Sequence, residues 1–230
     1  MIKKFLLLLL IFNLTPQTSS AAAPQELNLS RLNTSQLEDI YQYYDYKGVR
    51  GYLMLPGYHY PPIYLSSFPT DFDAVADEQK RIALFIKILA PLALRFNQQT
   101  LEQRQVIEQI KQNFDKNHEL SAEESRIIEK TAAEYDVFTR LKGYQRHKFL
   151  LTELLNRVDA VPPSFLIAAA AMETNWGTSR IVKEGNSLYK QLVWHSDKGL
   201  KPRGETEDDT YRIRTCLLYT SPSPRDMRRS

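Results

Sequence analysis

The sequence predicts a mainly α-helical domain that carries loops and short strands toward its C-terminal end. From about residue 74, apolar side chains recur with the spacing of one helix face. Helix-start signals precede several of these stretches, and from Gly185 onward glycines, prolines and charges alternate with short apolar pieces. The chain has 230 residues and no internal repeat, so we expect one domain plus an extension.

The first 23 residues are typical of a secretory signal peptide. Lys3 and Lys4 are followed by an apolar run from Phe5 to Leu14 and by small residues at 20–23. The run is too short for a membrane span, which needs about 20 residues. We therefore expect export to the periplasm, with transient membrane contact only; an uncleaved anchor is the alternative.

Residues 24–73 form a Tyr/Pro-rich extension with one short helix, expected near Ser35 to Tyr44. Prolines interrupt a run of tyrosines, namely Tyr41, Tyr43, Tyr44, Tyr46, Tyr52, Tyr58, Tyr60 and Tyr64. Two interpretations are open: a surface that stacks on sugars, or an arm packed on the main domain with buried rings and exposed hydroxyls. We favour the packed arm.

The first long helical stretch carries an apolar stripe at positions i, i+3, i+4 and i+7, from Ile82 to Leu89. Pro91 is expected to kink or end this helix, because proline lacks the N–H that the helix needs. Thr100 with Gln103 matches a capping box, which predicts the start of a second helix.

Two further helices follow. Ser121 with Glu124 matches another capping box and predicts a helix to about Tyr135. A stripe from Leu151 to Val158 predicts the next helix, which should end before Pro162 and Pro163. We assign these stripes to core packing and not to chemistry.

The charge pattern gives no support for nucleic-acid binding. The formal net charge is +3. Lys3 and Lys4 supply two of these charges, and residues 225–229 supply two more, which leaves the body at −1. No basic stripe with interleaved aromatic residues is present.

Metal and cofactor chemistry are not expected. The histidines, His59, His118, His147 and His195, are far apart, and none forms an H-E-x-x-H pair. The chain contains neither a glycine-rich phosphate loop nor a G-x-S-x-G nucleophile turn. The single cysteine, Cys216, rules out a disulfide framework within the chain.

Residues 215–230 differ in character from the rest. They resemble a translated sequencing adapter, so we exclude them from fold reasoning. On this interpretation the main domain, residues 74–214, is incomplete.

The most informative segment runs from Val161 to Trp194. Pro162 and Pro163 suit a first helical turn, and an apolar, alanine-rich stretch follows. Glu173 lies near the end of this helix, on one face with Leu166, Ala169 and Ala170, and Gly177 is a natural stop.

An apolar wall and a helix C-terminus both favour the protonated form of a carboxyl group. Such an acid can protonate the leaving oxygen when a glycosidic bond breaks. Glu173 is thus a candidate general acid. The alternative is an ordinary solvent-exposed residue at a helix end.

Three segments carry a resemblance to a known family. They are residues 157–162 (RVDAVP), 170–180 (AAMETNWGTSR) and 184–189 (EGNSLY). They resemble the Bax-like branch of the bacterial glucosaminidases, a glycoside hydrolase family 73-type group of peptidoglycan hydrolases. The resemblance covers about residues 80–214.

The resemblance implies a lysozyme-like helical domain with a small β-lobe across a cleft. It implies hydrolysis of peptidoglycan glycan strands after N-acetylglucosamine, without a cofactor, and it gives Glu173 the acid role. It places three further residues around the cleft: Trp176 (structural), Tyr189 (facing sugar) and Asn186. Trp194 is a candidate for stacking on a sugar ring, with a core position as the alternative, and Tyr211 is a further candidate for lining the cleft.

Glycoside hydrolysis needs a second group that activates water or stabilises the transition state. The resemblance implies that this group is a carboxylate of the β-lobe, some thirty to forty residues beyond the acid. Glu207 or Glu205 is the candidate, within an acidic run that is equally compatible with a solvated loop. The sequence departs from the family pattern at Thr174–Asn175 and at Lys190, which puts the subsite preference in doubt.

Two alternative functions remain open. One is a lytic transglycosylase, which also uses one glutamate in a lysozyme-like fold. The other is a non-catalytic protein of the envelope that binds peptidoglycan. The type of glycan end released would separate the transglycosylase from the hydrolase, and binding to sacculi without any released fragment would indicate the binding protein.

Overall fold

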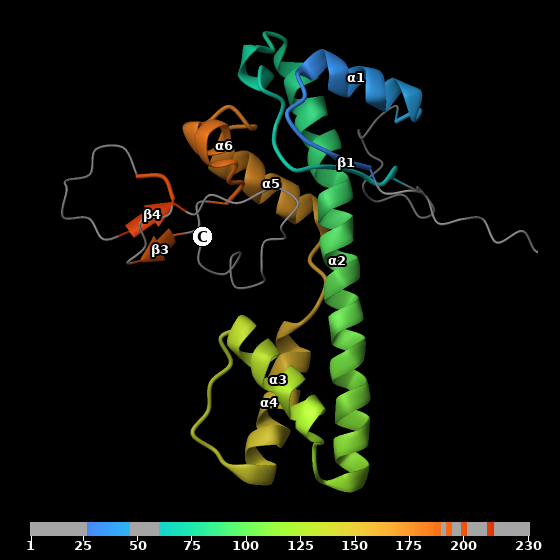
Figure 1. The fold of residues 1–230 in the computed structure, drawn as a ribbon, viewed down its shortest axis with the longest axis vertical. Helices are drawn as coiled ribbons and strands as arrows, with labels where there is room; N and C mark the ends of the chain where they lie inside the picture. The colour runs from blue at the N-terminus through green and yellow to red at the C-terminus, as the bar shows by residue number, and fades with distance from the viewer. Residues whose placement is uncertain (1–26, 47–59, 190–191, 195–198, 202–210, 214–230) are drawn as a thin grey trace, which may run out of the picture.

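The computed structural model describes residues 27–46, 60–189, 192–194, 199–201 and 211–213. The fold is mainly helical, as predicted, with short strands near both ends of the described chain. Figure 1 shows one long helix, α2 (Glu78–Asn117), along which the other helices lie in an upper and a lower group, while the two strands at the C-terminal end of the described chain lie to one side of it.

Helix α2 corrects two predictions. Pro91 neither ends the helix nor divides it, and the helix continues for 40 residues. Thr100, expected to cap a new helix, lies buried inside α2, and its hydroxyl donates to the Phe96 carbonyl at 3.0 Å. The Gln103 amide reaches instead to Glu134 on another helix. The sequence matched the capping pattern, but the helix packs against the upper group before this point and against the lower group after it, and this tertiary packing overrides the local signal.

The tyrosine-rich extension forms real structure against α2. Strand β1 (Leu27–Leu29) pairs in parallel with β2 (Ile63–Leu65), and a short 3-10 helix, η2 (Phe72–Ala74), follows. Helix α1 (Thr34–Tyr43) matches the prediction within one residue and begins with a capping box at Asn33.

The tyrosines of this extension follow the packed-arm interpretation in part. Tyr41, Tyr46 and Tyr64 are buried, whereas Tyr43 is exposed. The hydroxyls of the buried rings are not all exposed, because Tyr46 donates its hydroxyl to a carbonyl of α2. Tyr52 and Tyr58 lie outside the described residues.

The lower group consists of α3 (Ala122–Glu134) and α4 (Gly143–Arg157), which pack on the C-terminal half of α2. The predicted capping box of Ser121 and Glu124 is confirmed. The loop between α3 and α4 is held by Arg146, whose guanidinium binds both carboxylate oxygens of Glu129 and the Thr139 carbonyl.

A short linker returns the chain to the upper group. The Asn97 amide on α2 donates to the Val161 carbonyl at 2.6 Å and accepts from the Val161 N–H at 3.0 Å. Helices α5 (Pro163–Thr174) and α6 (Arg180–Gly185) follow, then the antiparallel strands β3 (Leu192–Trp194) and β4 (Tyr211–Ile213). None of the helices within the described ranges has the length and apolar character needed to cross a membrane.

Candidate active site

Helix α5 positions the candidate acid. Pro163 opens the helix, and the Pro162 carbonyl accepts from the N–H groups of Phe165 and Leu166. Glu173 lies half-buried in the last turn, one residue before the helix ends at Thr174. Leu166 and Ala170, on the predicted shared face, are buried. The carboxyl group therefore emerges at the junction of the core and the surface.

The helix ends in a turn of three consecutive residues with positive φ. Asn175, Trp176 and Gly177 have φ values of 49°, 54° and 81°. The Trp176 N–H donates to the Ala171 carbonyl, and the Thr174 hydroxyl accepts from the Gly177 N–H at 3.1 Å. Positive φ is uncommon for residues other than glycine, so these hydrogen bonds and the packing of the turn must offset the strain.

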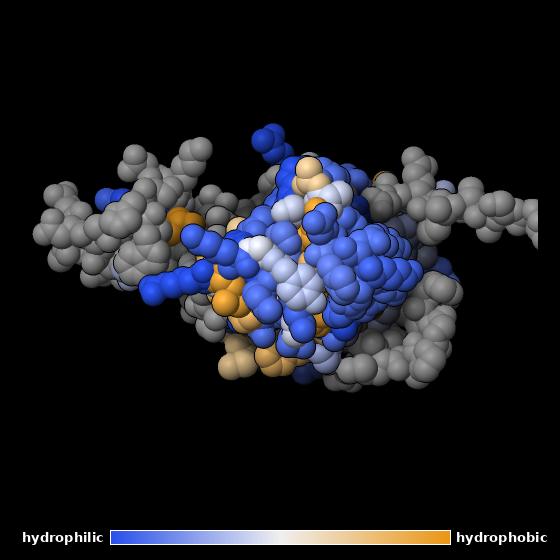
Figure 2. Space-filling view, turned by 90° about the horizontal axis from the view of Figure 1, so that it is seen from below, coloured by the Kyte–Doolittle hydropathy of each residue, from blue (hydrophilic) through white to orange (hydrophobic). Residues whose placement is uncertain are grey.

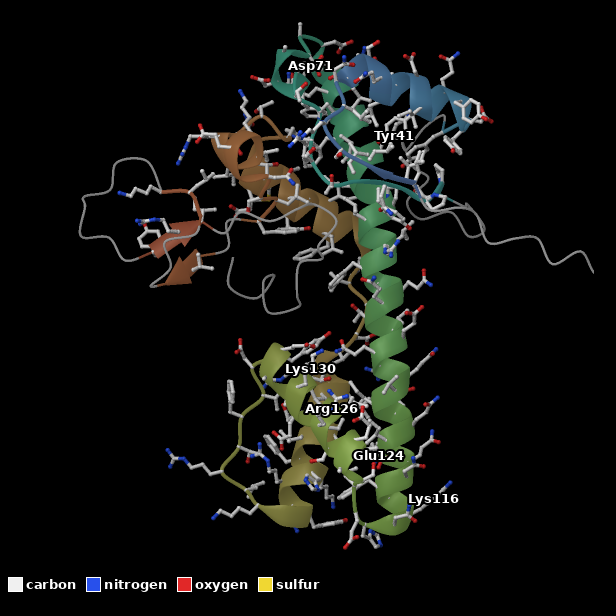
Figure 3. The ribbon with its side chains drawn as sticks, in the orientation of Figure 1. Tyr41, Asp71, Lys116, Glu124, Arg126 and Lys130 are labelled. Carbon is white, nitrogen blue, oxygen red and sulfur yellow. The ribbon has the colours of Figure 1, made fainter. Side chains whose placement is uncertain are left out.

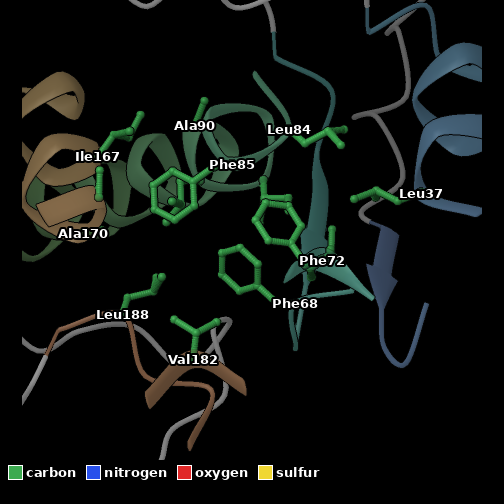
Figure 4. Packing of buried hydrophobic residues seen from close by; sticks show 14 of the residues in the cluster. Leu37, Phe68, Phe72, Leu84, Phe85, Ala90, Ile167, Ala170, Val182 and Leu188 are labelled. Carbon is green, nitrogen blue, oxygen red and sulfur yellow. The ribbon is translucent and has the colours of Figure 1, made fainter. Parts of the chain in front are cut away.

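Gly177 packs closely against three phenylalanine rings, which are labelled in Figure 4. A Cβ atom at this position would lie 2.9–3.1 Å from ring atoms of Phe72, Phe68 and Phe85. Beside it, the Trp176 ring meets Phe85 edge-to-face at a centroid distance of 5.6 Å. Trp176 is thus half-buried in the packing that fixes the end of α5, and its place at a cleft stays a prediction.

Asn186 joins the end of α6 to the segment after β2. Its side-chain amide donates to the Ser66 carbonyl at 2.5 Å, and its amide oxygen accepts from the Phe68 N–H at 3.3 Å. The residue has a φ of 48° and caps α6. Asn186 therefore has a clear role within the fold, and a contact with sugar stays a prediction.

Tyr189 leans back onto α5. Its hydroxyl donates to the Leu166 carbonyl at 3.1 Å, and its burial raises the pKa of the phenol. The ring helps to line a small apolar cavity of about 30 Å³ between α2 and α5. A cavity of this size holds at most about one water molecule, so it is not itself a sugar site. Contact of Tyr189 with sugar stays a prediction.

The β3–β4 pair is attached beside α6. Trp194 and Tyr211, both proposed to line the cleft, are directly paired in the antiparallel register. Ile213 of β4 is buried in the hydrophobic core of the upper group. The Arg180 guanidinium at the start of α6 donates to the Lys201 carbonyl. The tertiary structure thus places this pair next to the helix that follows Glu173.

The two candidates for the second carboxylate, Glu205 and Glu207, lie outside the described residues. Within the described part of the chain, no cluster of three or more potential metal ligands occurs.

The surface of α5 carries a feature that we did not predict from the sequence. Phe165 and Met172 are 65% and 85% exposed, and Ala168 between them is also exposed. These residues, spaced at i, i+3 and i+7, form an apolar stripe that ends beside Glu173. The sequence contains a signal for this stripe. Helix α5 is apolar on all sides, and such a helix is usually covered by apolar neighbours on every face.

Comparisons with protein-family models, with curated proteins and with solved structures gave no match for this chain.

Proposed function

We propose that this chain is a peptidoglycan hydrolase that cleaves the glycan strand after N-acetylglucosamine, with Glu173 as the general acid. The observation that carries the proposal is the half-buried position of Glu173 at the end of α5, where a strained, tightly packed turn fixes the helix end. The sequence motif around this turn resembles that of the Bax-like glucosaminidases.

The geometry suits an acid that acts on a long polymer. The turn of Asn175, Trp176 and Gly177 limits movement of the helix end, which favours a fixed position for the acid. The stripe of Phe165 and Met172 offers an apolar surface on the approach to the carboxyl group. Sugar rings have apolar C–H faces, and exposed aromatic side chains pack well against them.

In the proposed reaction, the Glu173 carboxyl donates its proton to the glycosidic oxygen as the bond to the anomeric carbon breaks. Water then adds to that carbon and gives up a proton to a carboxylate base, for which Glu207 and Glu205 are the candidates. The β3–β4 pair is the proposed β-lobe of a lysozyme-like fold, and Trp194 and Tyr211 would face the glycan. The reaction requires no cofactor, and the proposed location is the periplasm.

The test is Glu173→Gln, which keeps the shape of the side chain and removes the acid. We expect release of soluble fragments from purified peptidoglycan sacculi to fall about 10²–10⁴-fold, the usual contribution of a general acid. The control is Glu119→Gln, an exposed glutamate between α2 and α3 that lies outside the candidate site and should retain activity. Thermal unfolding of both variants checks that the fold is intact.

The products decide the reaction type. Reducing N-acetylglucosamine ends support the proposal, whereas 1,6-anhydromuramic ends would identify a lytic transglycosylase. If both the parent chain and Glu173→Gln bind sacculi and neither releases fragments, the chain is a binding protein and the proposal fails.

A further inference from the structure

A second surface lies far from Glu173, on the loop between α3 and α4. This loop, Tyr135–Lys142, carries two exposed apolar residues: Phe138 is 73% exposed and Leu141 is 46% exposed. Tyr144, in the first turn of α4, is 42% exposed. Figure 2 looks onto the lower end of the molecule, where small hydrophobic patches interrupt a mainly hydrophilic surface.

The exposure is not a result of a loosely attached loop. Val137, directly before Phe138, is buried in the lower core, and its N–H donates to the Ala132 carbonyl at 2.8 Å. The Thr139 carbonyl accepts from Arg146, and its hydroxyl accepts from the Leu141 N–H. The fold therefore holds Phe138 and Leu141 in water by fixing the backbone on either side.

Tyr144 forms the base of this surface. Its ring stacks on Phe114 of α2 at a centroid distance of 5.0 Å, so one face is anchored and the rest is exposed.

The charges around these apolar groups are of one sign. The segment from Phe138 to Lys148 contains Arg140, Lys142, Arg146 and Lys148 and has no aspartate or glutamate. Arg146 is neutralised by Glu129, whose pKa is lowered by this pairing. Arg140, Lys142 and Lys148 are exposed, and none of the three forms an ion pair with another described residue.

The helices that flank this loop, α3 and α4, carry five glutamates, and each of them has a partner within the fold: Glu123 with Arg126, Glu124 with Ser121, Glu129 with Arg146, Glu134 with Lys130 and Glu153 with Arg157. The loop itself contains one acidic residue, Asp136, which is partly buried. Three exposed cations thus share one short segment of the chain with an exposed phenylalanine and leucine.

We propose that this surface, Phe138–Tyr144 with Lys148, docks the protein on an anionic lipid bilayer. The apolar side chains of the surface would enter the boundary between lipid headgroups and acyl chains. Its lysine and arginine side chains would stay at the level of the headgroups and bind the lipid phosphates. A bilayer is deformable and needs no complementary shape, which suits a projecting loop better than a rigid protein partner does. An acidic glycan or peptide would use the cations but would leave Phe138 and Leu141 in water.

The experiment measures binding of the full chain to phosphatidylcholine vesicles with and without phosphatidylglycerol. We expect binding to require phosphatidylglycerol and to weaken with added salt. Because the apolar N-terminal run is common to all variants, only differences between variants are interpreted.

Arg140→Gln with Lys142→Gln should weaken binding about 30-fold, at the usual contribution of a basic residue near an anionic membrane. The charge control is Lys116→Gln with Lys130→Gln. Both are exposed lysines at the lower end of the molecule, and both are labelled in Figure 3. This control should bind within about threefold of the parent, because neither lysine belongs to the segment that carries Phe138 and Leu141.

Phe138→Ser with Leu141→Ser should weaken binding about tenfold or more through lost apolar transfer. The matched change on α2, Leu101→Ser with Val106→Ser, removes apolar groups that are also exposed and should have little effect.

A local probe separates this loop from the rest of the chain. In Phe138→Trp, the added fluorescence should shift to the blue on vesicles that contain phosphatidylglycerol, whereas Leu101→Trp should not shift. Unchanged binding of both loop variants, or an unshifted probe at 138, would overturn the proposal. So would loop-dependent binding to sacculi but not to vesicles. These measurements do not use activity on sacculi, so their outcome is independent of whether the proposed function is correct.

Discussion

Gly177 shows at the scale of one residue why the turn after Glu173 has so little freedom. Its φ of 81° disfavours any side chain, and three phenylalanine rings occupy the space that a Cβ would need. A positive φ favours glycine, and the occupied space at the Cβ position excludes a larger residue. Together they make this residue the point at which the end of α5 is fixed to the upper core.

Gly177→Ala should therefore lower the free energy of unfolding by about 2–4 kcal/mol, from backbone strain together with overpacking. Gly143→Ala is the control, because Gly143 also has a positive φ, of 55°, but nothing within 4 Å of an added Cβ. It should cost about 1 kcal/mol, from strain alone. Urea unfolding measures both; equal losses would mean that the phenylalanine rings simply move aside.

Helix α2 raises the question, at the scale of an element, of how a helix passes through a proline. Pro91 has no N–H to donate to the carbonyl of Lys87, four residues earlier, and an interior proline costs about 3 kcal/mol. Here the Tyr46 hydroxyl donates to that carbonyl at 3.1 Å. A buried tyrosine of the N-terminal extension thus supplies the hydrogen bond that the proline removes from the helix.

Tyr46→Phe should lower the free energy of unfolding by about 1–2 kcal/mol, because the Lys87 carbonyl then loses its partner in a partly buried place. The exposed Tyr43 provides the control: Tyr43→Phe should change stability by less than about 0.5 kcal/mol. Thermal and urea unfolding of the two variants give the comparison. If Tyr46→Phe lowers the free energy of unfolding no more than Tyr43→Phe does, a water molecule replaces the tyrosine as the hydrogen-bond donor to the Lys87 carbonyl at no cost.

At the scale of the whole molecule, α2 is shared by two separate hydrophobic clusters. The upper cluster joins α1, β2, α5 and α6 to the N-terminal half of the helix, and the lower cluster joins α3 and α4 to its C-terminal half. A third, smaller cluster of described residues lies between them along α2 and consists of Ala93, Phe96 and Leu166, with Val161 packed against it. We therefore expect the two ends of the molecule to open separately.

Leu150→Ala, in the lower cluster, should cost about 2–5 kcal/mol as a core cavity. Amide hydrogen exchange should then accelerate in α3, α4 and the lower half of α2, while α5 keeps its protection. The reciprocal change, Leu89→Ala in the upper cluster, should accelerate exchange in α5 and spare α3 and α4. Uniform acceleration in both variants would show that the clusters open as one unit.

The sequence alone determined the features that depend on neighbouring residues. The capping box of Ser121 and Glu124 and the short helix near Ser35 were predicted because each signal is complete within one turn. The helical segment that ends beyond Glu173 was predicted from its proline start and alanine content. Glu173 was chosen from the motif around it, and its role stays a prediction.

Only the tertiary structure decided what depends on distant contacts. The sequence predicts a kink or an end at Pro91 and a new helix at Thr100, because it does not show that the Tyr46 hydroxyl donates to the Lys87 carbonyl or that Thr100 is buried within α2. Nor does it show that Gly177 meets three phenylalanines, or that Phe165 and Met172 face outward. Local signals fix which conformations a segment can adopt, and burial against the rest of the chain selects among them.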